Sequence, residues 1–151
     1  MNIHRDFEEF LKLLIDERVE FVIVGGYAVT FHGYIRATQD IDIFYRNSKE
    51  NLLLIQNSLS KFGLSTTPGQ LSEFENPGSI IRIGIAPVRI ELINSISGIS
   101  FDEVWQNRVP GHYGKIPVFF ISFQDLLKNK REAGRLKDLA DIDELGGNRE
   151  Q

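Results

Sequence analysis

Residues 20–45, EFVIVGGYAVTFHGYIRATQDIDIFY, are the stretch from which the fold can be predicted. Residues 20–24 are almost wholly apolar and β-branched, which predicts a short strand buried on both faces. Gly25-Gly26 ends that run, and a short helix is expected over residues 27–32. Residues 40–45 predict a second strand. The stretch is therefore expected to form a strand, a glycine turn, a helix and another strand.

Outward from this stretch, apolar periodicity and turn residues predict the remaining elements. Helices are expected from residue 7 to about Glu17, over residues 48–62 and 101–107, and in two pieces after Ser122 that Gly134 separates. Strands are expected over residues 80–85, 88–93 and 116–121. The tight join between the first two of these strands predicts an antiparallel hairpin, and residues 66–78 are predicted to be a loop. The fold class is therefore α/β or α+β, with a mixed β-sheet flanked by helices.

The bulk composition narrows the class of protein. A chain of 151 residues is expected to form one domain, residues 1–151. It contains no cysteine, which excludes disulfides, thiolate metal sites and cysteine nucleophiles and suits a cytoplasmic location. Its N-terminal residues are expected to form an amphipathic segment and not a secretory signal, and no apolar run approaches the length needed to span a bilayer. The formal charge of −4 argues weakly against a general nucleic-acid-coating protein.

Asp40-Ile41-Asp42-Ile43 is the sharpest chemical feature of the sequence. Alternate side chains of a strand share a face, so both carboxylates point the same way, roughly 6–7 Å apart at the backbone. Two carboxylates held in this way repel each other, and a divalent cation commonly offsets that cost. Hard oxygen ligands favour Mg²⁺ or Mn²⁺. The alternative is a pair of solvated aspartates at the end of a strand.

The turn at Gly25-Gly26 bears on the same chemistry. Glycine lets a phosphate approach the backbone, and the N-terminus of a following helix offers free N–H groups and a favourable dipole. The spacing matches neither the dinucleotide-binding fingerprint nor the P-loop. A tight strand-to-helix turn without a ligand is the alternative.

A third carboxylate is available on a later strand. In residues 88–92, Arg89 and Glu91 share the polar face. If this strand lies beside the Asp40 strand, Glu91 completes a site of three carboxylates. Otherwise Glu91 forms an ion pair with Arg89 or Arg82 on an exposed face of the sheet.

These motifs, in this order and spacing, resemble the nucleotidyltransferase superfamily that includes DNA polymerase beta. The nearer resemblance is to bacterial minimal nucleotidyltransferases of the abortive-infection, type IV toxin kind. The matching pieces are Gly25-Gly26-Tyr27-Ala28, His32-Gly33, the Arg-x-Thr-x-Asp-x-Asp run at residues 36–42, and the Lys-x-x-Ala-x-Arg-x-Lys-Asp run at residues 130–138. Two positions depart from the pattern: Gly26 stands where active family enzymes usually have serine, and Glu91 stands where aspartate is more usual.

The resemblance implies that Lys130 and Lys137 face the site and bind the triphosphate; a solvated helix face is the alternative. Arg36 and Thr38 precede the aspartates and are expected to hold phosphate oxygens. Pairing between Arg36 and Asp40 is the alternative there. Together with the glycine turn, these residues form the expected nucleotide-binding set.

The function implied is a Mg²⁺- or Mn²⁺-dependent transfer of a nucleoside monophosphate from a nucleoside triphosphate to an acceptor hydroxyl on RNA or protein. Asp40, Asp42 and Glu91 are the expected catalytic and metal-binding residues. The resemblance further implies a toxin of a toxin–antitoxin or abortive-infection system, with a cognate antitoxin as partner and no role for a membrane.

Two other classes of function draw on the same residues. A catalytically degenerate nucleotide- or partner-binding module is favoured by Gly26 and Glu91, the two departures from the pattern. Phosphatase chemistry with Asp40 as nucleophile leaves the glycine turn unexplained and finds no hydroxyl residue soon after Asp42.

Overall fold

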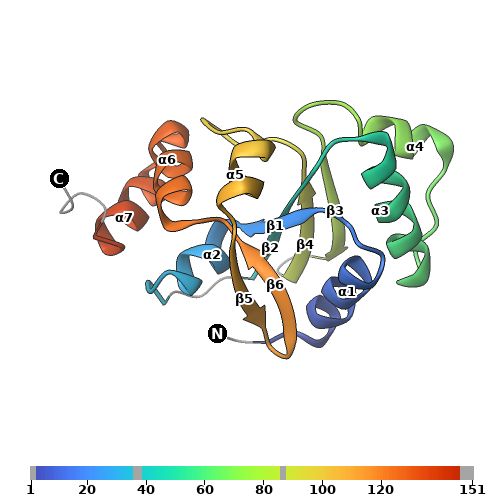
Figure 1. Cartoon of the computed structure of the whole chain (residues 1–151), viewed down its shortest axis with the longest axis horizontal. Helices are drawn as coiled ribbons and strands as arrows, with labels where there is room; N and C mark the ends of the chain where they lie inside the picture. Colours follow the sequence, from blue (N-terminus) through green and yellow to red (C-terminus); the bar gives the residue numbers. More distant parts are fainter. Residues whose placement is uncertain (1–2, 36–38, 86–87, 147–151) are drawn as a thin grey trace.

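The structure, a computed structural model, describes residues 3–35, 39–85 and 88–146 (Figure 1). In these ranges the helices are α1 (Arg5–Asp16), α2 (Gly25–Phe31), α3 (Lys49–Lys61), α4 (Pro68–Glu73), α5 (Phe101–Asn107), α6 (Phe123–Ala133) and α7 (Leu136–Glu144). The strands are β1 (Phe21–Val24), β2 (Ile41–Tyr45), β3 (Ile80–Ile85), β4 (Val88–Ile93), β5 (Val109–Tyr113) and β6 (Ile116–Phe120).

The strands form one six-stranded sheet in the order β3-β4-β2-β1-β6-β5. The pairs β2–β4 and β1–β6 are parallel, and the other three neighbouring pairs are antiparallel. The expected hairpin is the β3–β4 pair, and all four residues of β1 are buried, as its β-branched run predicts. The prediction of a mixed sheet flanked by helices is therefore confirmed.

Helices cover both faces of the sheet (Figure 1). Phe44 lies in β2 next to Ile43, and its ring packs edge-on against Phe101 of α5. Near the β3–β4 hairpin, Phe7 of α1 borders the same small hollow as Ile90 of β4, and α1 packs against α3. The central strands are thus enclosed by helices, and nearly all of β2 is buried.

Local capping explains where several helices begin and end. The Ser48 and Ser122 side chains accept hydrogen bonds from the Asn51 and Asp125 backbone N–H groups, which caps α3 and α6. Gly134 adopts φ +65° and ends α6, as its position in the sequence predicts. Left-handed backbone at this position favours glycine.

One prediction of secondary structure was wrong, and one strand was not predicted. Residues 66–78 were expected to be a loop, but α4 forms within them because Thr67 and Gln70 make a capping box around Pro68 at the first helical position. The strand β5 was not predicted from the sequence; it contains Pro110 and Gly111, which are residue types common in turns. It forms at the edge of the sheet, where a proline is tolerated because no second neighbour needs its missing N–H.

None of the helices in the described ranges is long and apolar enough to cross a lipid bilayer.

Candidate functional site

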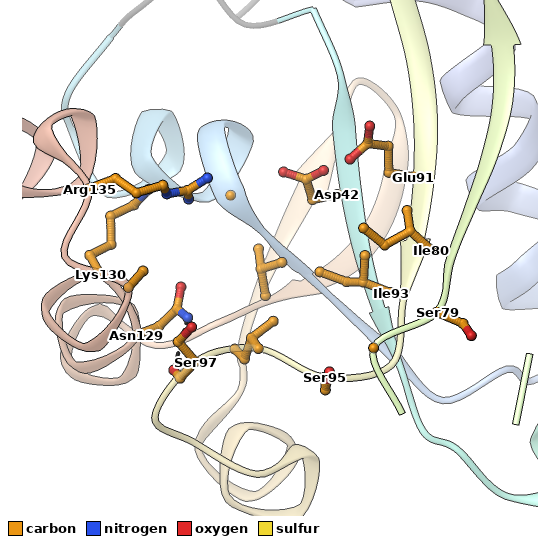
Figure 2. Close-up of a pocket in the computed structure, with 15 residues that line it drawn as sticks. Asp42, Ser79, Ile80, Glu91, Ile93, Ser95, Ser97, Asn129, Lys130 and Arg135 are labelled. Atoms are coloured by element: carbon orange, nitrogen blue, oxygen red, sulfur yellow. Dashed lines mark hydrogen bonds between the residues drawn. The ribbon is translucent and has the colours of Figure 1, made fainter. Parts of the chain in front are cut away.

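Asp42 and Glu91 form a pair of facing carboxyl groups on neighbouring strands. They are direct partners in the parallel β2–β4 register, and Figure 2 shows both side chains on the same side of the sheet. Burial raises the pKa of Asp42 to about 7, helped by the charge of Glu91, by a hydrogen bond to Glu91 and by the charge of Asp40, while Lys137 acts in the opposite direction. The surroundings of Asp42 therefore disfavour its charged form.

Gly25 lies directly against this pair. Val24, the last residue of β1, is the antiparallel partner of Asp42. The backbone of the following residue, Gly25, therefore lies beside the Asp42 carboxylate. Gly25 has φ +68°, and a Cβ built on it would lie 2.1 Å from Asp42 Oδ2. Both the backbone angle and the lack of space require glycine at this position.

Asp40 is held at one side of the pair by Arg89. Its carboxylate accepts a hydrogen bond from the Arg89 backbone N–H at 3.1 Å and forms an ion pair with Arg89 Nη2 at 3.6 Å. Glu91 Oε1 lies 4.0 Å from the same Nη2 and 3.4 Å from Arg82 Nε. Across residues 3–35, 39–85 and 88–146, no three acidic, histidine or cysteine side chains come together as a ready set of metal ligands.

The pair opens into a cleft of about 640 Å³. Figure 2 shows its two ends: Lys130, Asn129 and Arg135 lie on one side of Asp42, with Ile80 and Ile93 on the other. The complete lining is Val24, Gly25, Asp42, Gly78, Ser79, Ile80, Glu91, Ile93, Ser95, Ile96, Ser97, Asn129, Lys130, Ala133 and Arg135. One end of the cleft is therefore cationic, and the other is neutral and partly apolar.

The cationic end is built by the α6–α7 junction. Lys130 is not on a solvated helix face: its side chain is 5% exposed, and its Nζ lies 3.2 Å from Asp138 Oδ1 and 3.0 Å from Asp141 Oδ2. Arg135 is 62% exposed, and its Nε donates to Asp138 Oδ2 at 2.6 Å. Burial alone would raise the pKa of Asp138, but the hydrogen bonds from Arg135 and Lys130 hold it below its ordinary value.

The other residues expected at the site lie at different places. Gly26 is buried within α2. Lys137 is exposed in the first turn of α7, outside the cleft lining, although its charge lowers the pKa of Asp42. Arg36 and Thr38 lie outside the described residues. Thus Asp42, Glu91, Gly25 and Lys130 share one cleft, while Asp40 and Lys137 lie beside it.

Sequence reasoning did not assign a role to Arg135 or to the cleft-lining serines. Arg135 belongs to the basic run at residues 130–138, and its position directly after Gly134 was the available signal. A glycine in left-handed conformation ends a helix and changes the direction of the chain. The side chain of the next residue, here Arg135, therefore does not lie along the face of α6.

A family model described as "Nucleotidyltransferase of unknown function (DUF6036)" matches residues 2–146. The chain belongs to this nucleotidyltransferase family. No curated protein sequence matches the chain significantly. Membership of this family assigns the protein to the transferases and implies a nucleotide substrate.

Solved structures share the fold of this family member at low sequence identity. A protein from Thermotoga maritima, provisionally assigned as a nucleotidyltransferase, is 15% identical with a TM-score of 0.63 and covers 96% of this chain and 92% of its own. The lincosamide antibiotic adenylyltransferase LnuA, solved with lincomycin, is 16% identical with a TM-score of 0.54 and covers 96% and 98%. An antigenic nucleotidyltransferase-like protein from Paracoccidioides brasiliensis is 14% identical with a TM-score of 0.54 and covers 93% and 72%.

Nucleotidyltransferases generally use a divalent metal ion, and the chemistry of this site fits one. Asp42 and Glu91 supply oxygen donors of the kind that Mg²⁺ prefers. Burial, together with the charge of Glu91, raises the pKa of Asp42, and a cation between the two carboxylates would offset the cost of ionising Asp42. Water and phosphate oxygens normally complete the coordination shell of Mg²⁺, so two protein carboxylates are enough to bind it together with a nucleotide.

Proposed function

We propose that the protein transfers a nucleoside monophosphate from a nucleoside triphosphate to an acceptor hydroxyl on RNA or protein. The observation that carries this proposal is the Asp42–Glu91 pair, which lies under Gly25 in a cleft with one cationic end. The carboxylates suit the reacting α-phosphate, and the cationic end suits the β- and γ-phosphates.

The reaction forms one bond and breaks one bond. The acceptor oxygen attacks the α-phosphorus, the bond from that phosphorus to the β-bridging oxygen breaks, and pyrophosphate leaves. Glu91 accepts the proton of the attacking hydroxyl, and the cationic end of the cleft stabilises the leaving pyrophosphate. Asp42 and Glu91 would hold Mg²⁺ or Mn²⁺, with Asp40 joining them on release from Arg89; the metal ion supplies charge neutralisation and a lower pKa for the attacking hydroxyl.

A biological role follows from the resemblance in the sequence. We propose that the protein acts in the cytoplasm as the toxin of a toxin–antitoxin or abortive-infection system and is restrained by a cognate antitoxin. A small regulatory gene beside its own gene, whose product binds the protein and suppresses transfer, would support this role.

The test is a transfer assay with each of the four labelled nucleoside triphosphates, Mg²⁺ or Mn²⁺, and total cellular RNA and protein. Small hydroxyl-bearing antibiotics form a further arm, because the LnuA structure contains lincomycin. Label should appear on one acceptor class with wild type and be lost with Asp42→Asn. Asp16→Asn is the matched control, because this carboxylate is exposed on α1 and pairs with Lys12 one helical turn away.

The competing function is a degenerate module that binds a nucleotide or a protein without transfer. Clear nucleotide binding with no label on any acceptor class would favour it. Equal label with wild type and Asp42→Asn would remove the carboxylate pair from the chemistry.

A further inference from the structure

The cationic end of the cleft contains four charged side chains in a fixed order of contact. Arg135 contacts Asp138, Asp138 contacts Lys130, and Lys130 contacts Asp141. The formal charges of the four side chains cancel, but only the two cations, Lys130 and Arg135, line the cleft. Three of the four are almost completely buried, with side-chain exposures of 5% for Lys130, 1% for Asp138 and 2% for Asp141. Arg135 is the one member of this group that faces solvent.

We propose that Arg135 is the side chain that binds the terminal phosphates, and that Lys130 is a positioning residue acting through Asp138. This inference rests on the proposed function in one respect, namely that a triphosphate occupies the cleft. It gives the two cations different roles, whereas the basic run in the sequence suggests that they act alike.

Lys130 is already committed to its two aspartates. The amine of Lys130 donates a hydrogen bond to the buried Asp138 carboxylate at 3.2 Å and forms an ion pair with the buried Asp141 carboxylate at 3.0 Å. Turning the amine toward a phosphate would move its positive charge away from two buried carboxylates, which is unfavourable. The amine therefore serves to keep Asp138 ionised and fixed in place.

Asp138 in turn fixes the guanidinium of Arg135. It accepts from Nε at 2.6 Å, from Nη2 at 3.3 Å and from the Arg135 backbone N–H at 3.3 Å. A guanidinium has five donors in a rigid planar fork, and none of the described residues bonds Nη1. Arg135 is thus pre-oriented and still has donors available for an anion.

The direction of Arg135 agrees with this role. Figure 2 shows its guanidinium extending across the cleft toward Asp42, and the charge of Asp42 contributes to the raised pKa of Arg135 after the larger effect of its hydrogen bond to Asp138. An anion held there would lie beside the carboxylate pair, as the β- and γ-phosphates must when the α-phosphate reacts. Planar forks suit phosphate oxygens well.

The test measures binding of inorganic tripolyphosphate and of each nucleoside triphosphate, with Mg²⁺, to the purified full chain by calorimetry. Arg135→Gln should weaken binding roughly ten- to a hundredfold, as expected for loss of a charge-assisted contact. The same variant should lower the melting temperature of the ligand-free protein modestly, because Asp138 loses the hydrogen bonds from the guanidinium but keeps its pair with Lys130. Lys128→Gln is the matched control: this lysine is half-exposed on α6 beside Glu103 and should bind like wild type.

A double-mutant cycle tests the positioning role. Asp138→Asn should weaken binding through Arg135, so adding it to Arg135→Gln should cause no further loss. Lys130→Met should lower the melting temperature, and where it folds it should likewise add nothing in the Arg135→Gln background. In the transfer assay, Arg135→Gln should mainly raise KM for the nucleotide.

Three outcomes would overturn the inference. They are unchanged binding in Arg135→Gln, additive losses in the Arg135–Asp138 cycle, and a further loss from Lys130→Met in the Arg135→Gln background, which would mean that Lys130 contacts phosphate itself. Binding that follows the expected pattern without transfer to any acceptor would support the inference and reject the proposed activity. Transfer by Arg135→Gln with an unaltered KM for the nucleotide would support the proposed activity and reject the inference about Arg135.

Discussion

The backbone of Gly25 lies so close to the Asp42 carboxylate that a Cβ at residue 25 would come within 2.1 Å of Oδ2. Gly25→Ala should therefore displace Asp42 and abolish the stabilisation of the protein by Mg²⁺ and nucleoside triphosphate. Strain at φ +68° adds a stability loss of about 1–2 kcal/mol. Thermal melting with and without both ligands measures the two effects separately.

Gly63→Ala is the matched control for this change. Gly63 has φ +101°, and a Cβ added there would meet nothing within 4 Å, so alanine brings strain without a clash. It should lower stability and keep the full response to the ligands. A normal ligand response in Gly25→Ala would show that Asp42 is not held by this contact.

The raised pKa of Asp42 predicts a specific dependence of stability on pH. Its ordinary value is 3.8 and its value in the folded protein is about 7, so the native state binds more protons than the unfolded state between these values. Stability is therefore lost as pH rises through that window. Asp42→Asn removes this loss and should melt a few degrees above wild type at pH 8.

The difference between Asp42→Asn and wild type should shrink toward pH 4, where the aspartate is largely protonated in the folded state and half-protonated in the unfolded state. Saturating Mg²⁺ at pH 8 should also narrow it, by stabilising wild type alone. Asp16→Asn, at an exposed position, should show neither trend. A variant that melts at or below wild type at pH 8 without metal would contradict the assigned cause.

Glu91→Gln separates binding from chemistry. The amide keeps the size of the side chain and removes its ability to accept a proton, so nucleotide-induced stabilisation should persist while transfer falls by at least about a hundredfold. Melting shifts and the labelled-transfer assay give the two readouts on one sample. Retained transfer would exclude Glu91 as the proton acceptor.

Arg89→Gln tests whether this arginine competes with a metal ion. Its guanidinium lies 3.6 Å from Asp40 Oδ2 and 4.0 Å from Glu91 Oε1, and its loss makes the site more negative. Mn²⁺ should then bind roughly three- to tenfold more tightly, as measured by the melting shift across a Mn²⁺ titration. Arg5→Gln, on the exposed start of α1, should leave the titration unchanged, and weaker Mn²⁺ binding in Arg89→Gln would mean that Arg89 organises the site.

Much of the local structure was predictable because its causes lie within a few residues. The β-branched run of β1, the cap at Ser122 and the left-handed Gly134 each act through neighbours in the chain. The strand β5 was not predicted. A strand can contain Pro110 where it lies at the edge of a sheet, and the neighbouring residues in the sequence do not indicate that position. Capping by Thr67 was a local signal, but it lacked the apolar periodicity used to find helices.

The sequence predicted several residues of the site, but it did not predict which of them contact one another. The alternation of side chains along β2 predicts on which face of the sheet Asp42 lies. Its pairing with Glu91 requires that β4 pairs in parallel with β2, and the two strands are far apart in the sequence. The burial of Lys130 depends on how α7 folds back on α6, since both of its partners lie on α7. Such contacts come from tertiary packing, and spacing along the chain specifies them only weakly.

The α6–α7 junction also sets the order in which the protein matures during synthesis. The carboxylates come from β2 and β4, whereas Arg135 and its buried partners come from the last two described helices and the turn between them. A ribosome therefore exposes Asp42 and Glu91 well before the cations that face them. The cleft is complete only when α7 has emerged and folded onto α6. If the cleft binds a nucleotide as proposed, a nascent chain would therefore not bind it until translation has passed α7.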